Sequence, residues 1–168
     1  MATKTSKPVR RRNSPSKRLI VIGASAGGIE AVGKLLSELP GDLASAVMVV
    51  IHIASDSPYV LPGIFQRETR LKLMPHVNDC DAIRPGCVYL APPDCHMLVN
   101  DGHVRLSTGP YENRHRPAID PLFRSAANAR GRNVIGVILT GNLGDGSAGL
   151  QAIKQCGGIT VVQDPADA

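Results

Sequence analysis

From Leu19 onward, short apolar runs alternate with longer stretches of helical pattern, and this alternation constrains the fold more than any other feature of the chain. The runs 19–23, 47–53 and 134–139 are predominantly apolar on both sides of an extended chain, as expected of parallel strands that are covered on both faces. Parallel strands need crossover connections, and stretches of helical pattern follow these runs. We therefore predict an α/β fold: a doubly wound, mostly parallel sheet with helices on both faces, in three layers α/β/α.

The remaining elements fit the same plan. Further strands are expected at 87–90 and 159–162. Helices are expected at four places, 27–36, 57–66, 118–130 and 147–156. Pro58 suits the first turn of the second of these helices, where its missing N–H costs nothing. Residues 96–106 contain two short apolar runs separated by Asn-Asp-Gly, which suits a tight turn, so we expect a small antiparallel hairpin insert.

Basic charge is concentrated at the start of the chain. Seven of the 19 Lys and Arg residues precede the first acidic residue, Glu30, and the rest of the chain carries 12 basic against 14 acidic residues. The formal net charge of +5 therefore comes from residues 1–18, and no nucleic-acid partner is expected. We expect residues 1–18 to be a disordered basic tail, either solvated or a weak docking arm, and residues 19–168 to form one folded domain.

Composition also bears on location and cofactors. No apolar run approaches the ~18 residues of a membrane span, and the basic start lacks the apolar core of a secretory signal, so a cytoplasmic protein is expected. The four cysteines form no CxxC pair and are expected to be reduced thiols. His76, His96 and His103 share no ligand-like spacing and are interpreted as loop or surface residues, so no metal or other cofactor is predicted.

Polar side chains follow three of the expected strands. Ser25 comes after the first strand, His52 lies at the end of the second, and Asp145 follows the long apolar run 134–139. Ligands of open α/β sheets bind beyond the carboxyl ends of the strands, so these three side chains are expected to converge. A hydroxyl nucleophile, an imidazole base and a carboxylate that orients the base are the components of a serine hydrolase triad.

Each of the three residues also has a simpler interpretation. Ser25 lies in Gly-Ala-Ser-Ala-Gly-Gly at 23–28, which matches the G-x-S-x-G turn of a nucleophile, but a helix cap or a cofactor-binding turn has the same residue types. His52 can be a hydrogen-bonded core histidine, and Asp145 can cap the helix that follows it. The expected convergence favours the joint interpretation, a triad of Ser25, His52 and Asp145.

Four separated blocks carry a family resemblance. They are Gly-Ala-Ser-Ala-Gly-Gly at 23–28, Val-Ile-His-Ile at 50–53, Arg-Pro-Ala-Ile-Asp-Pro-Leu-Phe-Arg-Ser-Ala at 116–126, and the turn 140–146, which begins Thr-Gly and ends Asp-Gly. In this order they resemble the catalytic domain of chemotaxis protein-glutamate methylesterases of the CheB type. The resemblance runs from about Leu19 to the end of the chain. It implies a bacterial hydrolase with Ser25, His52 and Asp145 as catalytic residues, often with protein-glutamine glutaminase activity as well.

The chain departs from the family pattern at the edge of the expected site. Ala26 stands where the family usually has threonine, and Asn142 and Leu143 stand where it usually has methionine and glycine. The resemblance places the N–H groups that bind the oxyanion near Ala26 and Asn142.

The resemblance also implies partners. The substrate would be methylated cytoplasmic helices of chemoreceptors, with a separate receiver or methyltransferase protein as a further partner and no membrane insertion. Arg116 and Asp120 are candidate contacts to an acidic receptor surface, with a solvated helix face as the alternative, and His115 shares that ambiguity.

The domain organisation implied by the resemblance is a stand-alone catalytic domain without the family's receiver domain. The family normally continues with a further helical segment after 163–165, so a shortened carboxyl end is expected. Two rival interpretations remain: a general esterase acting on small molecules, and a non-catalytic binding module of the same fold.

Overall fold

The computed structural model describes residues 18–25, 27–140, 144–164 and 166. The predictions made for residues 1–17, Ala26 and Asn142 concern residues outside this set.

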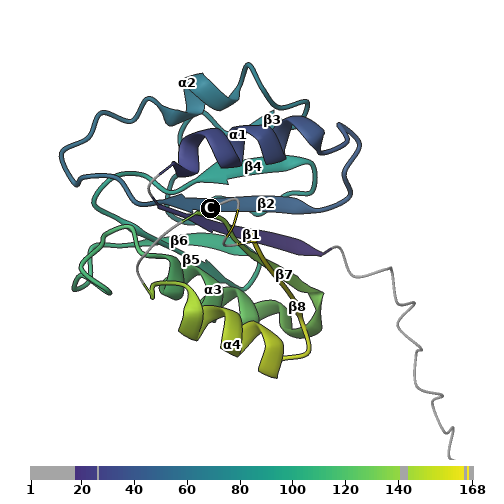
Figure 1. Cartoon of the computed structure of the whole chain (residues 1–168), viewed down its shortest axis with the longest axis vertical. Helices are drawn as coiled ribbons and strands as arrows, with labels where there is room; N and C mark the ends of the chain where they lie inside the picture. Colours follow the sequence, from purple (N-terminus) through teal and green to yellow (C-terminus); the bar gives the residue numbers. More distant parts are fainter. Residues whose placement is uncertain (1–17, 26, 141–143, 165, 167–168) are drawn as a thin grey trace, which may run out of the picture.

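A six-stranded parallel sheet runs through the middle of the molecule (Figure 1). In chain order its strands are β1 (Leu19–Ala24), β2 (Ala46–Ile51), β3 (Lys72–Leu73), β4 (Cys87–Leu90), β7 (Val134–Ile138) and β8 (Ile159–Val162). Across the sheet they follow the order β3-β4-β2-β1-β7-β8. β1 therefore lies between β2 and β7, in a register that pairs Leu19 with both Ala46 and Val134.

Helices cover both faces of this sheet (Figure 1). One face carries α1 (Gly28–Glu38) and α2 (Leu61–Phe65), and the other carries α3 (Ile119–Arg130) and α4 (Ser147–Gln155). A two-stranded antiparallel hairpin, β5 (His96–Asn100) with β6 (His103–Ser107), lies on the α3 side, and a 3₁₀ turn (Gly131–Asn133) links α3 to β7. The predicted α/β class, with its three layers and its hairpin insert, is confirmed.

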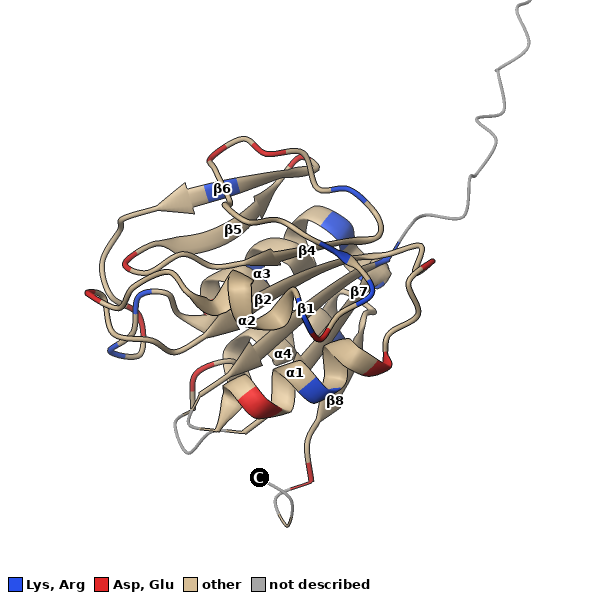
Figure 2. Ribbon diagram, turned by 90° about the horizontal axis from the view of Figure 1, so that it is seen from above, with Lys and Arg blue, Asp and Glu red and all other residues tan. Residues whose placement is uncertain are grey.

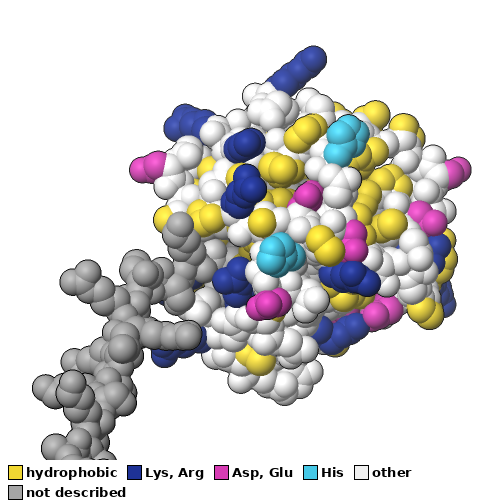
Figure 3. All heavy atoms as spheres, turned by 180° about the vertical axis from the view of Figure 1, so that it is seen from behind, with side chains coloured by type: hydrophobic (Ala, Val, Ile, Leu, Met, Phe, Trp, Pro, Cys, Tyr) yellow, Lys and Arg dark blue, Asp and Glu magenta, His cyan; other side chains and the backbone are white. Residues whose placement is uncertain are grey.

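The sheet holds two cores because alternate residues of each strand point to opposite faces. In β2, Val47 and Ile51 pack on the α1 side, whereas Met48 and Val50 pack on the α3 side. The strands β1, β2, β4, β7 and β8 carry no Lys, Arg, Asp or Glu. Among the residues that the structure describes, charge is therefore confined to the hairpin, the short β3, the helices and the loops (Figure 2). On the face seen in Figure 3, charged side chains of both signs are interspersed and form no extended field of one sign.

The order of the strands creates a switch point beside β1. After β1 the chain adds β2, β3 and β4 on one side of it, and later adds β7 and β8 on the other. The loops that leave β1 and β7 therefore turn toward opposite faces of the sheet, which opens a crevice at the carboxyl ends of these strands. Ser25 lies directly after β1, at this crevice.

Two predictions about individual elements are wrong. The helix expected to begin near Pro58 begins instead at Leu61. A proline does occupy its first turn, as expected, but it is Pro62. His96 was expected in a loop or at the surface, but it is 4% exposed and forms the first residue of β5. β3 was not predicted, because two residues are too few to show a period.

Within the residues that the structure describes, no helix combines the length and the apolar character needed to cross a bilayer. The four cysteines, Cys80, Cys87, Cys95 and Cys156, are free thiols, as predicted.

Candidate active site

Backbone hydrogen bonds join the loops that leave the central strands. The N–H of Ser25 donates to the carbonyl oxygen of Thr140 at 2.9 Å, and the N–H of His52 donates to that of Ala24 at 3.0 Å. These bonds continue the parallel ladder just beyond β1, β2 and β7. The first residues of three separate loops are thereby held side by side.

Small residues allow the sharp turn from β1 into α1. Gly27 has a φ of 74°, a left-handed conformation that glycine adopts without steric cost. A Cβ on Gly28 would lie 2.6 Å from the Cβ of Ala24, so any larger residue would force the helix away from the strand. The turn leaves the half-buried Ser25 at its tip, directly before the start of α1.

Ser25, His52 and Asp145 form a continuous hydrogen-bonded row. Nδ1 of His52 lies 3.1 Å from Oγ of Ser25, and its Nε2 lies 2.7 Å from Oδ2 of Asp145. The His52 side chain is 6% exposed and that of Asp145 is fully buried. Because an ionised carboxylate only accepts hydrogen bonds, the imidazole proton belongs on Nε2, which leaves the Nδ1 lone pair facing the serine hydroxyl.

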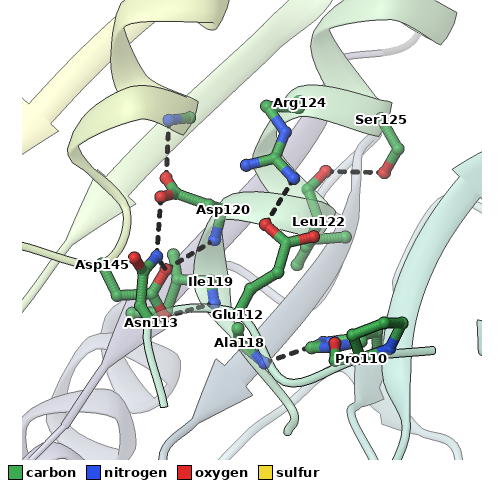
Figure 4. Close-up of polar contacts among 12 residues, drawn as sticks. Pro110, Glu112, Asn113, Ala118, Ile119, Asp120, Leu122, Arg124, Ser125 and Asp145 are labelled. Carbon is green, nitrogen blue, oxygen red and sulfur yellow. Dashed lines mark hydrogen bonds and ion pairs between the residues drawn. The ribbon is translucent and has the colours of Figure 1, made fainter. Parts of the chain in front are cut away.

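The Asp145 carboxylate is held by four donors, several of which appear in Figure 4. Besides His52, they are the backbone N–H of Ile119 at 2.7 Å, the backbone N–H of Asp120 at 3.0 Å, and Nδ2 of Asn113 at 2.8 Å. Burial alone would raise the pKa of Asp145, but the bond from His52, the two backbone bonds and the Asn113 amide lower it to about 2. Asp145 is therefore ionised at neutral pH despite its burial.

Asp120 lies behind the row and not on the surface where a receptor contact was expected. It is 4% exposed, and Oδ1 accepts the N–H groups of Gly146 at 3.0 Å and Gly149 at 2.7 Å. Oδ2 accepts Nδ2 of Asn113 at 2.9 Å, so the same amide bridges the carboxylates of Asp120 and Asp145 (Figure 4). The correction has a physical cause: a buried carboxylate needs several donors, and here three protein groups supply them.

Arg116 borders the site, but its guanidinium is engaged within the protein. Nε donates to Oδ1 of Asp94 at 2.8 Å, and Nη1 donates to the carbonyl oxygens of Thr108 and Gly109 at 3.0 and 2.9 Å. The guanidinium also lies over the ring of Tyr111, 4.5 Å from its centre. These contacts fix the loop between β6 and α3 against the hairpin side of the molecule.

A cleft of about 430 Å³ opens beside the row. Its lining residues are Ser25, His52, Ile53, Ala54, Ser55, Tyr111, Arg114, His115 and Arg116. On its other side Ser25 faces a second hollow, which is bordered by the first residues of α1 and by Glu68. The Ser25 hydroxyl is thus accessible to a ligand, while the Asp145 carboxylate behind it is shielded from solvent.

Sequence reasoning missed two residues of this site. Asn113 was not singled out, and His115 was assigned no definite role, yet the ring of His115 stacks on that of His52 with 3.6 Å between centroids and 5° between planes. Both residues precede the recognisable 116–126 block and belong to an irregular loop. The only local sign was an Asn in a loop, a residue that tolerates the left-handed conformation with φ of 50° found here.

His96 helps to hold the loop between β6 and α3 in place. Its Nε2 lies 2.9 Å from the carbonyl oxygen of Pro110, and its Nδ1 accepts the N–H of Ala118 at 3.2 Å. These two bonds place the proton of the ring on Nε2. Among the described residues, no cluster of His, Cys, Asp and Glu side chains is arranged to hold a metal ion.

The fold and this geometry define a class: an open parallel α/β domain with a Ser–His–Asp arrangement of the serine hydrolase kind at its switch point. The profile of the CheB methylesterase family matches residues 20–168. The chain belongs to the CheB methylesterase family.

Relatives and a solved structure agree with this assignment. The protein-glutamate methylesterase/protein-glutamine glutaminase 5 of Anaeromyxobacter dehalogenans is 40% identical over 158 residues, which cover 90% of this chain and 42% of the relative. A protein of Chromohalobacter salexigens named for the same two activities is 41% identical over 153 residues, which cover 89% and 43%. The chain thus spans less than half the length of these curated relatives.

The crystal structure of the CheB methylesterase catalytic domain of Thermotoga maritima superposes with a TM-score of 0.83 at 30% sequence identity. The superposition covers 89% of this chain and 81% of the Thermotoga chain.

Proposed function

We propose that residues 19–168 form the catalytic domain of a protein-glutamate methylesterase, which hydrolyses methyl esters on the glutamate side chains of chemoreceptors. The observation that carries this proposal is the row of hydrogen bonds from Ser25 through His52 to Asp145 at the edge of an accessible cleft. The names of the relatives support the choice of substrate. The triad assignment is part of the proposal.

In the first half of the reaction the serine hydroxyl attacks the ester. Nδ1 of His52 accepts the proton of Ser25 as Oγ bonds to the carbonyl carbon, and a tetrahedral oxyanion forms. On the far side of the ring, the Asp145 carboxylate accepts the hydrogen bond from Nε2–H of His52 and stabilises the imidazolium. When the C–O bond to the methoxy group breaks, His52 returns the proton to the departing oxygen, so methanol leaves and Ser25 is acylated.

The second half of the reaction repeats these proton transfers with water. His52 removes a proton from a water molecule that attacks the acyl carbon, and then protonates Ser25 as the acyl–oxygen bond breaks. The products are a free glutamate side chain and the regenerated enzyme. The low pKa of Asp145, about 2, keeps this carboxylate in its accepting form through the cycle.

We assign the binding of the oxyanion to N–H groups near Ala26 and Asn142, on the basis of the family resemblance. The start of α1 favours this side of Ser25, because the first N–H groups of a helix have no partner within it and carry a partial positive charge. The N–H of Gly28 is not one of the available donors, since it donates to the carbonyl oxygen of Ser25 at 2.8 Å. Each well-placed donor contributes about 3 kcal/mol to transition-state stabilisation.

A second activity, hydrolysis of glutamine side chains, is favoured by the names of the relatives, which pair methylesterase with glutaminase. The proposed chemistry accommodates it, because His52 can protonate a departing amine as it protonates methoxide. Ammonia would then leave in place of methanol.

The decisive experiment follows methanol release from receptor fragments that carry radiolabelled glutamate methyl esters. The purified chain is expected to release volatile label. Ser25→Ala is expected to lower kcat by roughly 10⁴- to 10⁶-fold, as in other serine triads. Ser37→Ala is the matched control, because the hydroxyl of Ser37 only donates to the carbonyl of Lys34 near the end of α1.

The other outcomes would contradict the proposal in different ways. Turnover of a small ester such as p-nitrophenyl acetate without action on the receptor would indicate a general esterase. Tight binding of the receptor fragment without turnover would indicate a binding module. Turnover by Ser25→Ala equal to that of the unmodified chain would exclude Ser25 as the nucleophile.

A further inference from the structure

His115 covers one face of the His52 ring. The two imidazoles are nearly parallel, with centroids 3.6 Å apart and an interplanar angle of 5°. His115 comes from the loop between β6 and α3, whereas His52 follows β2 on the sheet. The stack is therefore a tertiary contact between distant segments and no consequence of local geometry.

The backbone around His115 is held on both sides. Its N–H donates to the carbonyl oxygen of Glu112 at 2.8 Å, and its carbonyl oxygen accepts the N–H of Glu112 at 3.2 Å. The next residue, Arg116, is tied to Asp94 and to two backbone carbonyls. A ring carried on so constrained a segment can act as a rigid wall for its neighbour.

The hydrogen bonds of His52 leave one motion unrestrained. Its bonds to Ser25 and Asp145 both lie in the plane of the ring, at Nδ1 and Nε2. These two bonds fix the orientation of the ring within its own plane. They only weakly resist a tilt of the plane about the line that joins Ser25 Oγ and Asp145 Oδ2. A flat ring packed against one face opposes this tilt and also keeps water from that face.

The nitrogen atoms of His115 do not explain its position. Its Nε2 is buried and has no hydrogen-bond partner among the described residues. Burial lowers the pKa of His115, and the neighbouring His52 lowers it further, against an opposing influence of Asp145. Burial and the neighbouring His52 thus favour the neutral form of the ring, whose π face lies against His52 and would attract the imidazolium that forms there.

We propose that His115 is a positioning residue of the esterase, whose ring holds the plane of His52 between Ser25 and Asp145 through stacking and not through a hydrogen bond. This inference rests on the proposed function, since it concerns the geometry of the same triad. It assigns no proton transfer to His115.

The test compares two substitutions that separate the ring from its nitrogens. His115→Phe keeps a flat ring without nitrogen, and His115→Gln keeps a polar group of similar reach without the ring. We expect His115→Phe to retain kcat close to that of the unmodified chain. We expect His115→Gln to lower kcat by about 10- to 100-fold with little change in KM, because misplacing a catalytic group by about 1 Å has an effect of this size.

A second measurement does not depend on turnover. The proton on Nε2 of His52, bonded to Asp145, should give a downfield NMR resonance that is protected from solvent exchange. We expect this resonance to persist in His115→Phe and to broaden in His115→Gln, with thermal unfolding of both variants showing a folded chain. If the unmodified chain hydrolyses no ester, the proposed function fails, and the resonance still decides whether His115 positions His52.

Two results would overturn the inference. Equal loss of kcat in both variants would show that a nitrogen of His115 is required, and thus a polar role. Unchanged kcat and an unchanged resonance in His115→Gln would show that the stack does not constrain His52.

Discussion

Asp145 caps α3, the helix in which Asp120 lies, and Asp120 caps α4, the helix that Asp145 precedes. The Asp145 carboxylate accepts the N–H groups of Ile119 and Asp120 at the start of α3, while Asp120 accepts those of Gly146 and Gly149 at the start of α4. Asn113 donates to both carboxylates and closes the arrangement. The carboxylate that is hydrogen-bonded to His52 is therefore also a structural joint between two helices, so the site and the α3–α4 layer depend on each other.

Removal of the Asp120 carboxylate should weaken both. Asp120→Ala leaves two helix N–H groups without their acceptor and removes one of the two acceptors of the Asn113 amide, which keeps its bond to Asp145. The lost cap and the unsatisfied buried donors together predict a decrease of about 2–4 kcal/mol in the free energy of unfolding. We also expect kcat to fall, because Asp145 loses the support of this joint. Urea unfolding and ester turnover measure the two effects. Asp120→Asn, which keeps Oδ1 for both N–H groups, should lose less, and equal losses in the two variants would contradict the capping role.

The stability of the domain should depend on pH through Asp145. Its pKa is lowered from 3.8 to about 2 in the folded chain, so the folded state favours the ionised form. The resulting stabilisation, about 2 kcal/mol, is complete above pH 4 and is lost as pH falls from about 4 to about 2. Urea unfolding of the unmodified chain and of Asp145→Asn should therefore differ more at pH 6 than at pH 2. If the difference in the free energy of unfolding between the two proteins stayed constant from pH 6 to pH 2, the lowered pKa of Asp145 would be refuted.

The sequence predicts the parts of this site that lie on regular elements. Ser25, His52 and Asp145 directly follow strands or precede a helix, so the rule that functional groups gather at the carboxyl ends of parallel strands suffices to bring them together. Asp120 was predicted to lie near the site, but on the surface. The prediction of its exposure was wrong because its burial results from the packing of α3 against α4. Helix packing of this kind leaves no local pattern around one residue.

Asn113 and His115 could not be placed from local sequence for a related reason. Their loop has no period, and its path is set by contacts with distant residues, such as Arg116 with Asp94 and His96 with Pro110. A similar limit applies to α2, where two prolines, Pro58 and Pro62, suited a first helical turn equally well. The choice between them depends on which apolar side chains reach the core, and Leu61 and Phe65 do.

The loop that carries His115 should loosen when its guanidinium anchor is removed. Nε and Nη2 of Arg116 both contact Asp94, and Nη1 reaches two carbonyls, a planar fork that lysine cannot reproduce. We expect both Arg116→Ala and Arg116→Lys to speed limited proteolysis within 108–117 and to lower kcat. Asp94→Ala should show a weaker form of the same effect, because the carbonyl contacts remain. Full rescue by Arg116→Lys would show that charge alone holds the loop.

Close packing of α4 on α3 depends on Gly149. A Cβ at this position would overlap the Cβ of Phe123 and would lie 3.1 Å from Oδ1 of Asp120, the atom that accepts the Gly149 N–H. Gly149→Ala should therefore lower the free energy of unfolding by about 1–3 kcal/mol, as overpacking does, and should lower kcat by displacing the Asp120–Asp145 joint. Gly63→Ala is the control, because no atom lies within 4 Å of its added Cβ and alanine favours the helix by up to about 1 kcal/mol. If urea unfolding showed Gly149→Ala to be as stable as Gly63→Ala, the two helices could separate without consequence. The proposed mutual dependence of the site and the α3–α4 layer would then be wrong.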